Sequence, residues 1–177
     1  MSASNGRGSD AWYRSWTHFT VDRRSPAYCR VTFDHPPVNA ISATTVAEIA
    51  ELVGLIEDDA DLGVVVFDSA NPGYYLADYD VDHDASRSAW LDVLVRLSRA
   101  PVVNIASVRG RVGGAGREFV LACDLRFASR ENTPPGGGRA LGLLLVADDE
   151  LDDEVDQIAS RLARFDHEAP ARTLPGA

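Results

Sequence analysis

The chain alternates between short apolar runs and longer stretches in which apolar residues return at a helical period. The longest such stretch predicts a helix over 43–58, with apolar positions at Val46, Ile49, Leu52, Val53 and Ile56. Thr45 and Glu48 have the spacing of a capping box near its start. A second helix is predicted over 85–99, with apolar positions at Leu91, Leu94, Val95 and Leu97.

Short apolar runs bounded by turn residues predict the strands. These are 18–22, 28–34, 64–67, 102–108 and 124–128. The Val-Val-Val-Phe run at 64–67 is continuous, which is typical of a strand covered on both faces of its sheet. A glycine-rich turn and a short helix at 116–122 separate the last two strands. Strands that alternate with helices in this way predict an α/β fold.

The two ends of the chain differ from this middle part. Residues 1–15 begin with small polar residues and are expected to be an unstructured tail, followed by one core over 16–133. The remainder, 134–177, is expected to be a reduced C-terminal segment with one amphipathic helix at 150–165. The apolar stripe of that helix is Leu151, Val155, Ile158, Leu162 and Phe165. It can pack on its own domain or on another subunit.

Composition narrows the classes of partner. A chain of 177 residues is long enough for one domain, and its net charge of −10 argues against nucleic acid or an anionic membrane as a partner. All 17 basic residues are arginine, which excludes Schiff-base chemistry and a P-loop lysine. The absence of lysine has a simple explanation, which is codon bias in a GC-rich genome.

Other common site types have little support. Cys29 and Cys123 lie in apolar surroundings and are expected to be buried free thiols, and the four histidines lack paired-ligand spacing, so no metal site is expected. Neither a GxSxG elbow nor a dinucleotide-binding glycine pattern occurs in register with a helix. The chain shows no signal peptide and no apolar run near ~18 residues, so we expect a soluble cytoplasmic protein.

The most informative segment is 101–129, in which a buried strand leads through glycines 110, 113, 114 and 116 into a helix. Such a turn can hold an anion, because its glycines allow close approach and the helix start presents unpaired N–H groups. Glu118 is expected in the first turn of that helix. An anion site beside a carboxylate suits proton transfer next to a thioester carbonyl. The alternative is a purely structural turn, in which the acidic residue only complements the helix dipole.

Together with 33–42 (FDHPPVNAIS) and 64–81 (VVVFDSANPGYYLADYDV), this segment resembles the crotonase family, also called the enoyl-CoA hydratase/isomerase superfamily. The resemblance implies a crotonase-like spiral of ββα units whose C-terminal helical part is reduced here. It also implies an acyl-CoA thioester as ligand, whose carbonyl is polarised between two backbone N–H groups. No cofactor is implied beyond coenzyme A as part of the substrate.

The family motifs assign the site residues. A small residue followed by Ala-Gly-Ala-Asp corresponds to Leu76, Ala77, Asp78, Tyr79 and Asp80, which places the first N–H donor on Ala77. Three glycines, any residue and Glu correspond to Gly114, Ala115, Gly116, Arg117 and Glu118, which places the second donor on Ala115. Glu118 matches one of the two hydratase glutamates. Ala115 can serve only at an ordinary backbone position, and Asp78 is expected to point away or to be protonated.

The rest of the family pattern is incomplete. The Pro-Glu pair that carries the second glutamate is missing, since Asn132 and Thr133 run almost directly into a Pro-Pro-Gly-Gly-Gly stretch. Residues 139–149 resemble the start of a later family helix. The acidic cluster that begins at Asp78 and Asp80 can supply a replacement acid, bind a cation, or simply form a solvated loop, which is the commonest role of aspartates in turns.

Two hypotheses therefore remain. The first is an enzyme of the hydratase/isomerase type in which Ala77 and Ala115 stabilise a thioester enolate and Glu118 moves the proton. Gly114, Asp78, Tyr79 and Asp80 would then line the substrate site. The second is a non-catalytic member that binds acyl-CoA or a protein partner. Family members form trimers, and a homo-oligomer is expected less firmly here because the C-terminal helices are reduced.

Overall fold

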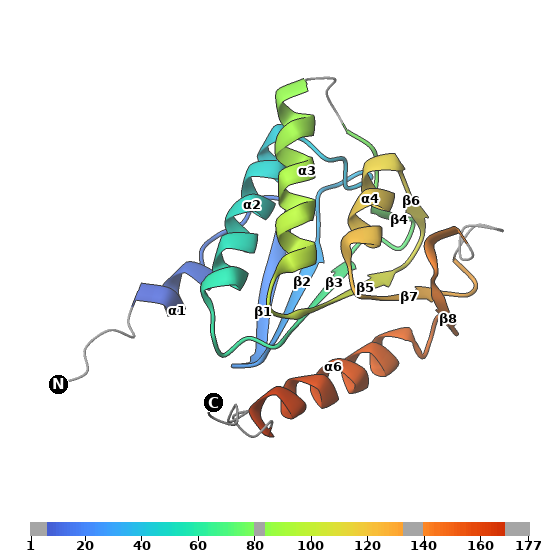
Figure 1. Ribbon diagram of the computed structural model, residues 1–177. Coiled ribbons are helices and arrows are strands. Elements are labelled where there is room, and N and C mark those ends of the chain that lie inside the picture. Colours follow the sequence, from blue (N-terminus) through green and yellow to red (C-terminus); the bar gives the residue numbers. More distant parts are fainter. Residues whose placement is uncertain (1–6, 80–83, 133–139, 169–177) are drawn as a thin grey trace, which may run out of the picture.

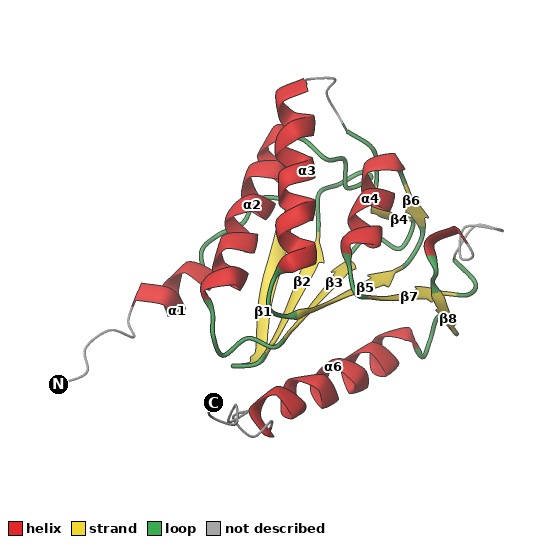
Figure 2. Cartoon of the chain, viewed as in Figure 1, coloured by secondary structure: helices red, strands yellow, loops and turns green. Residues whose placement is uncertain are grey.

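The computed structural model describes residues 7–79, 84–132 and 140–168 (Figures 1 and 2). The helices are α1 (Arg7–Trp12), α2 (Ala43–Asp58), α3 (Asp84–Arg99), α4 (Gly114–Ala122) and α6 (Leu151–Glu168). The strands are β1 (Phe19–Ser25), β2 (Tyr28–Phe33), β3 (Val64–Ser69), β4 (Tyr74–Leu76), β5 (Val103–Val108), β6 (Arg111–Val112), β7 (Leu125–Ser129) and β8 (Leu144–Val146). The α/β class and the order of elements through β7 are confirmed, whereas β4 and β6 were not predicted.

Six strands form the main sheet in the order β1-β2-β3-β5-β7-β8. β1 and β2 form an antiparallel hairpin, and each later pair in this sheet is parallel. β4 and β6 form a separate two-stranded parallel sheet. Because β4 follows β3 and β6 follows β5, the small sheet brings together the segments that leave two neighbouring strands of the main sheet.

Helices cover both faces of the main sheet (Figure 1), with α2, α3 and α4 on one face and α6 on the other. Alternate residues of β3 show this division. Val65 and Phe67 belong to the larger core under α2, α3 and α4, whereas Val64 and Val66 belong to the smaller core under α6. The prediction of a strand buried on both faces is therefore confirmed for 64–67.

α2 begins and ends where the periodicity predicted, but its capping residues differ. Ser42 is the N-cap, and Ser42 and Thr45 form the reciprocal capping box. Glu48 instead accepts hydrogen bonds from the backbone N–H groups of Thr17 (2.7 Å) and His18 (3.1 Å). The predicted box was thus wrong by one turn, because Glu48 faces the chain entering β1.

α3 buries only part of the predicted stripe: Leu94 and Leu97 are buried as expected. Trp90, Val93 and Leu97 are almost fully buried, whereas Leu91 and Val95 are 44% and 46% exposed. Both faces satisfy a helical period, so periodicity alone did not choose between them. Because of this orientation, the Trp90 ring packs against Tyr79 and Phe119.

The N-terminal tail was predicted too long. Residues 7–12 form α1, and the Trp12 side chain is buried beside α2 with the Arg23 guanidinium 4.8 Å from its ring centroid. The prediction of an unstructured segment is wrong for this part of 1–15, because Trp12 is an anchor. Residues 1–6 lie outside the described residues.

α6 packs on its own sheet, against β2, β3, β5 and β7, and buries Leu151, Val155, Ala159 and Ala163. Phe165, placed in the predicted stripe, is 65% exposed. The stripe follows an unbroken spacing of four residues, and the two small alanines allow the helix to approach the sheet closely. One of the two expected packing arrangements, on its own domain, is therefore present.

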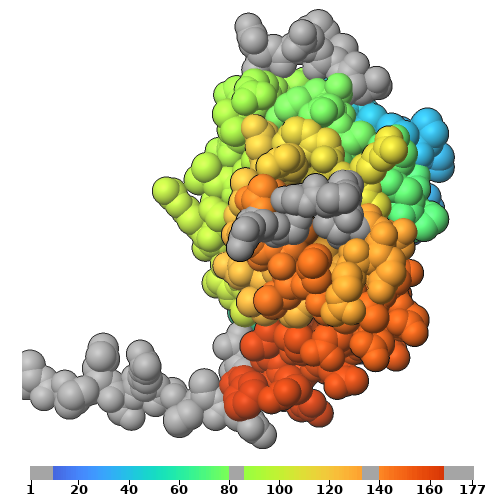
Figure 3. Space-filling view, turned by 90° about the vertical axis from the view of Figure 1, so that its right-hand side faces the viewer, coloured from blue at the N-terminus to red at the C-terminus, as the bar shows by residue number. Residues whose placement is uncertain are grey.

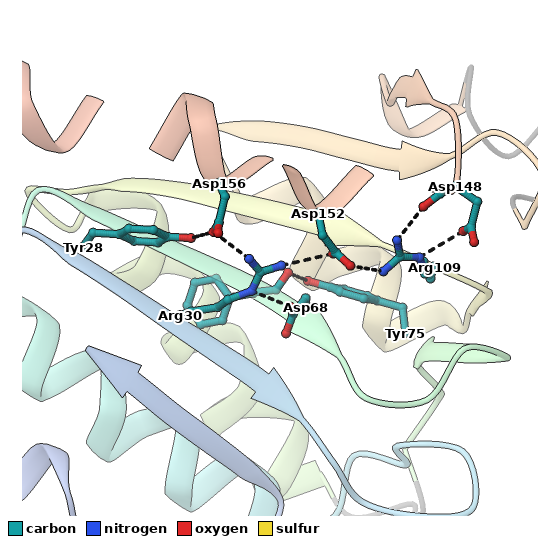
Figure 4. Close-up of polar contacts among 9 residues, drawn as sticks. Tyr28, Arg30, Asp68, Tyr75, Arg109, Asp148, Asp152 and Asp156 are labelled. Carbon is teal, nitrogen blue, oxygen red and sulfur yellow. Dashed lines mark hydrogen bonds and ion pairs between the residues drawn. The ribbon is translucent and has the colours of Figure 1, made fainter. Parts of the chain in front are cut away.

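Charged groups fasten α6 to the sheet (Figure 4). The buried Arg30 guanidinium on β2 pairs with Asp68 of β3 (2.6 Å) and with Asp152 (3.2 Å) and Asp156 (2.8 Å) of α6. Tyr28 donates its hydroxyl hydrogen to Asp156. Three carboxylates around one guanidinium compensate its burial, and these contacts fix the position of α6 along the strands.

A second arginine extends this network to the loop before α6. Arg109 pairs with Asp152 (2.9 Å) and Asp148 (3.0 Å), and it also donates to the Asp148 carbonyl (2.7 Å). Preceding this loop, β8 pairs with β7 and exposes Leu144 and Leu145. Residues 139–149 were expected to resemble the start of a family helix. Of these, 140–141 are helical, whereas 144–146 are strand.

Candidate active site

The glycine turn lies directly on the end of β4. β6 pairs with β4, and the Gly113 N–H donates to the Leu76 carbonyl at 2.8 Å. A Cβ at Gly113 would lie 2.6 Å from the Ala77 carbonyl carbon, and one at Gly116 would lie 2.5 Å from the Leu76 carbonyl oxygen. Both positions therefore require glycine because two backbones touch here. In Figure 3 the green and yellow segments lie next to each other near the top of the face.

α4 begins at Gly114, with Gly113 as an N-cap that has no side chain. Ala115 is a regular helical residue and its side chain is buried. It therefore has the ordinary backbone conformation that an alanine needs at this position. Its N–H does not point into an empty site. It donates to Oδ1 of Asp78 at 3.0 Å.

Asp78 thus provides the cap that Gly113 cannot. The expectation that its carboxylate points away is wrong, because the unpaired N–H groups at the start of α4 attract the negatively charged group that lies beside them. The residue as a whole is exposed, so water can solvate the carboxylate if it leaves. In this structure the N–H of Ala115 is therefore occupied by a carboxylate of the chain itself.

Ala77 also has a partner for its N–H, which donates to the Asn39 carbonyl at 3.1 Å. The same loop contacts the next residues, since the Ile41 N–H donates to the Asp78 carbonyl at 3.1 Å and Ile41 pairs with Tyr79 as a parallel bridge. A ligand oxygen that used the Ala77 N–H would have to replace a backbone hydrogen bond. The N–H of Tyr79 appears in no hydrogen bond among the described residues and is the second candidate donor on this segment.

Asn39 holds this loop in place. Its backbone is in the left-handed region (φ 55°), and its Oδ1 accepts from the His35 N–H at 2.8 Å. Its Nδ2 donates to Ser69 Oγ (2.8 Å) and to the Tyr75 carbonyl (3.0 Å). One amide therefore connects the loop to the end of β3 and to β4, which fixes the strand on which the glycine turn rests.

Glu118 lies in the second turn of α4 instead of the first, because the helix starts two residues earlier than predicted. Its Oε1 is 3.5 Å from Nη2 of Arg87 on α3. Its Oε2 is buried and has no hydrogen-bond partner among the described residues. The carboxylate is thus held at one oxygen only, while its side chain remains 33% exposed.

An aromatic pair lies beside this part of α4, and one of its members, Tyr79, is near Glu118. Tyr79 and Trp90 form an edge-to-face pair with ring centroids 6.2 Å apart, and Trp90 stacks on Phe119 at 6.0 Å. Burial raises the pKa of the Tyr79 hydroxyl to about 12, and the negative charge of Glu118 adds to this effect. The phenol therefore stays protonated at neutral pH and can donate a hydrogen bond.

The sequence reasoning missed Arg87 and Trp90. Both precede the buried Leu94 on α3 and lie three residues apart, so a helical projection aligned on Trp90 places them on one side of the helix. The signal that could have identified them is the single tryptophan within an otherwise aliphatic helix face. Of the predicted residues, the structure brings Ala77, Asp78, Tyr79, Gly114, Ala115 and Glu118 together around the turn.

Asp80 lies outside the described residues. Among residues 7–79, 84–132 and 140–168, no group of three His, Cys, Asp or Glu side chains is placed to hold a metal ion. No helix in these ranges combines the length and apolar character needed to cross a bilayer. Cys29 and Cys123 are buried and free, as predicted.

The fold and the turn together define a class of protein. A mostly parallel six-stranded sheet and a small two-stranded sheet lie beside a glycine turn, which leads into a helix whose first N–H groups lie next to a carboxylate. The family model described as "Enoyl-CoA hydratase/isomerase" matches residues 23–142, which is more than half of the chain. The chain belongs to the enoyl-CoA hydratase/isomerase family, and its fold is the crotonase fold.

Solved structures agree on the fold. An enoyl-CoA hydratase from Geobacillus kaustophilus is 19% identical with a TM-score of 0.75, and the match covers 85% of this chain and 76% of that one. One from Mycobacterium avium subsp. paratuberculosis is 20% identical with a TM-score of 0.74, covering 85% and 76%. One from Mycobacterium smegmatis is 21% identical with a TM-score of 0.73, covering 83% and 77%.

Proposed function

We propose that this chain is an acyl-CoA-binding enzyme of the hydratase/isomerase type, in which the α4 N-terminus stabilises a thioester enolate and Glu118 moves the proton. One observation carries the proposal. An anionic oxygen, Asp78 Oδ1, accepts the Ala115 N–H at 3.0 Å, close to a carboxylate whose second oxygen has no partner among the described residues. We infer that the thioester oxygen replaces Asp78 at this N–H.

A second N–H donor completes the oxyanion site in this proposal. The Ala77 N–H requires the loss of its bond to Asn39, whereas the Tyr79 N–H requires no such loss among the described hydrogen bonds. We therefore propose Tyr79 as an alternative to Ala77 for the first donor. Two aligned donors stabilise charge that develops on oxygen, and the loss of one costs about 10²–10³ in rate.

Glu118 provides the base. The proton next to the thioester carbonyl becomes acidic when the carbonyl oxygen is held by hydrogen bonds, and Glu118 Oε2 is free to take it. Return of the proton at another carbon gives isomerisation. Arg87 orients the carboxylate through Oε1 and keeps a positive charge nearby while the enolate forms.

The second candidate is a family member without turnover that binds acyl-CoA or a protein partner. It is favoured by the same contact, since Asp78 fills the donor that a substrate needs, and by the absence of the family's Pro-Glu pair from the sequence. An acyl-CoA thioester is the proposed ligand under the first candidate and one of the two proposed partners under the second. A homo-oligomer, a cytoplasmic location and the lack of a cofactor other than substrate coenzyme A stay predictions.

A titration with a conjugated enoyl-CoA separates the two candidates. An assembled oxyanion site polarises the enoyl group and shifts its absorbance to longer wavelength, and turnover makes this shifted absorbance decay. We expect Glu118→Gln to keep the shift and to abolish the decay, a loss of about 10²–10⁴ in rate. Glu51→Gln, on α2, serves as the matched control and should behave as the wild type.

Three results are informative. A stable shift in the wild type supports the non-catalytic candidate. No shift from the folded protein contradicts acyl-CoA binding altogether. Decay that persists unchanged in Glu118→Gln removes Glu118 from the mechanism.

A further inference from the structure

Six side-chain polar atoms are buried without a hydrogen-bond partner in the part of the chain that the structure describes. They are Asp68 Oδ1, Asn104 Oδ1, Ser107 Oγ, Tyr79 Oη, Trp90 Nε1 and Glu118 Oε2. Each such atom is costly, and a protein keeps few of them without a reason. The last three belong to Tyr79 and to two residues near it at the candidate active site, Trp90 and Glu118.

Tyr79 is the side chain that connects the other two, since it packs against Trp90 and lies near Glu118. Tyr79 meets the Trp90 ring edge-to-face, Trp90 stacks on Phe119, and Phe119 follows Glu118 on α4. Glu118 is also close enough for its charge to raise the pKa of Tyr79. Three different segments, the end of β4, α3 and α4, thus each contribute one unsatisfied polar atom.

The three atoms match one kind of group. The Trp90 indole N–H can only donate, and the Glu118 carboxylate can only accept. The Tyr79 phenol can donate, and it stays protonated because burial and the nearby carboxylate raise its pKa. A hydroxyl group or a water molecule has a hydrogen to give to Glu118 and two lone pairs to receive the other two.

We propose, on the basis of the function proposed above, that Tyr79 Oη, Trp90 Nε1 and Glu118 Oε2 form a hydroxyl subsite. It holds the water that adds to an enoyl thioester, and in the reverse direction the 3-hydroxyl of a 3-hydroxyacyl thioester. Tyr79 and Trp90 donate to the oxygen, and Glu118 accepts from it. The chain then hydrates its substrate with a single glutamate, because two neutral donors position the water.

The step balances without any further reactant. Glu118 takes one proton from the water as the water oxygen bonds to the β-carbon. The electrons of the carbon–carbon double bond move toward the thioester oxygen and form the enolate. Glu118 then returns the same proton to the α-carbon, which gives the 3-hydroxyacyl thioester and the starting carboxylate.

The first test compares two reactions of Tyr79→Phe, a change that keeps the ring and removes only the hydroxyl. Hydration of crotonyl-CoA should fall by about 10-fold to 100-fold, the effect of leaving a bound polar group unpaired. Exchange of the α-protons of butyryl-CoA in heavy water needs Glu118 and the oxyanion site only, and should not change. Tyr74→Phe, on the preceding strand β4, is the matched control and should leave both reactions unchanged.

The outcomes separate this inference from the proposed function. Exchange that is absent in the wild type and in Glu118→Gln alike contradicts the proposed function. Normal exchange with hydration unaffected in Tyr79→Phe overturns the hydroxyl subsite alone. An equal loss of both reactions also overturns it, because Tyr79 would then act only through packing.

The second test does not depend on turnover. The chain has three tryptophans, so its indole N–H signals in a nitrogen-15 NMR spectrum can be assigned with Trp12→Phe and Trp16→Phe. We expect 3-hydroxybutyryl-CoA to shift the Trp90 signal strongly and butyryl-CoA, which lacks the hydroxyl, to shift it little. Equal shifts with the two ligands contradict the subsite, and no shift with either contradicts acyl-CoA binding.

Discussion

The arginine network under α6 and the candidate active site treat buried polar groups in different ways. On the α6 face, Arg30 has three carboxylate partners and Arg109 has two (Figure 4). At the candidate active site, Tyr79, Trp90 and Glu118 each keep an unpaired polar atom among the described residues. Only Asp68 Oδ1 is unpaired within the arginine network, and the other oxygen of that carboxylate is bonded at 2.6 Å.

This difference separates polar groups that hold the fold from polar groups that are kept for a ligand. A buried charge stabilises a fold only when its partners are present, so a structural network is expected to be satisfied internally. A site that binds a hydroxyl and an enolate must leave its donors and acceptors unpaired until the ligand arrives. Variants in the two regions should therefore separate stability from activity.

The largest effect is expected from Arg30→Met, which removes the buried cation and keeps most of its aliphatic packing. Asp68 then stays buried without its charge partner, and the free energy of unfolding should fall by about 3–5 kcal/mol. Urea unfolding measures the change. The double variant Arg30→Met/Asp68→Val should recover much of the loss, because it removes the uncompensated charge.

Arg96→Met provides the matched control, since its pair with Glu57 is half-exposed and should contribute at most about 1 kcal/mol. If Arg30→Met is as mild as this control, the arginine network does not hold α6 and the comparison between the two regions fails. A double variant that is less stable than Arg30→Met would contradict the charge argument.

A smaller effect, with opposite signs for stability and binding, is expected from Asp78→Ala. The loss of the carboxylate removes the cap on the Ala115 N–H and should lower stability by about 1 kcal/mol. The same N–H becomes available to a thioester oxygen, so acyl-CoA affinity should rise by about tenfold, the equivalent of roughly 1.4 kcal/mol. Calorimetric titration with butyryl-CoA measures the gain.

Asp61→Ala, an exposed change elsewhere on the surface, controls for the lost charge. Affinity that falls in Asp78→Ala would show that the carboxylate takes part in the site instead of competing for it. The glycine turn would then have a purely structural role, and the oxyanion proposal would be wrong.

The smallest effect is expected on the stability of the protein at low pH. Hydrogen bonds from Ser129, Asn132 and Arg109 lower the pKa of Asp148 from its ordinary value of 3.8 to about 2. A lowered pKa means that the ionised form favours the folded state, so this contribution is complete above the ordinary value and is lost as the pH falls toward 2. Asp148→Asn should lower the melting temperature slightly at pH 6, and the difference from the wild type should disappear near pH 2.

A constant difference between the two proteins across this pH range would contradict the assignment. Asp149→Asn, one residue further along, is the neighbouring control and should show no comparable convergence.

The sequence pattern predicted helices and strands well where many residues contribute to the periodicity. α2 was predicted with its observed bounds because its five periodic apolar positions are all buried. β4 and β6 were missed because three and two residues carry no periodicity, and they exist only through pairing across the fold. The stripe of α3 was predicted only in part for a related reason. Two apolar stripes overlap on that helix, and packing against α2 and α4 decides between them.

The candidate site shows the same limit at the level of single side chains. The family motifs identified the glycine turn, Ala115 and Glu118, and the structure brings them together with Asp78 and Tyr79. The direction of the Asp78 carboxylate could not be read from its motif, because it depends on a helix start that arrives from 37 residues later in the chain. The unpaired atoms of Tyr79 and Trp90 likewise follow from packing between distant segments.

The parallel arrangement of β2, β3, β5 and β7 also determines how this chain can reach its fold. Only the β1–β2 hairpin can form from neighbouring residues, because an intervening helix separates the partners in each of the pairs β2–β3, β3–β5 and β5–β7. Sheets made of such distant pairs form slowly, on the order of milliseconds to seconds. The arginine contacts of α6, which need the finished sheet, should form late and therefore slow unfolding without speeding folding.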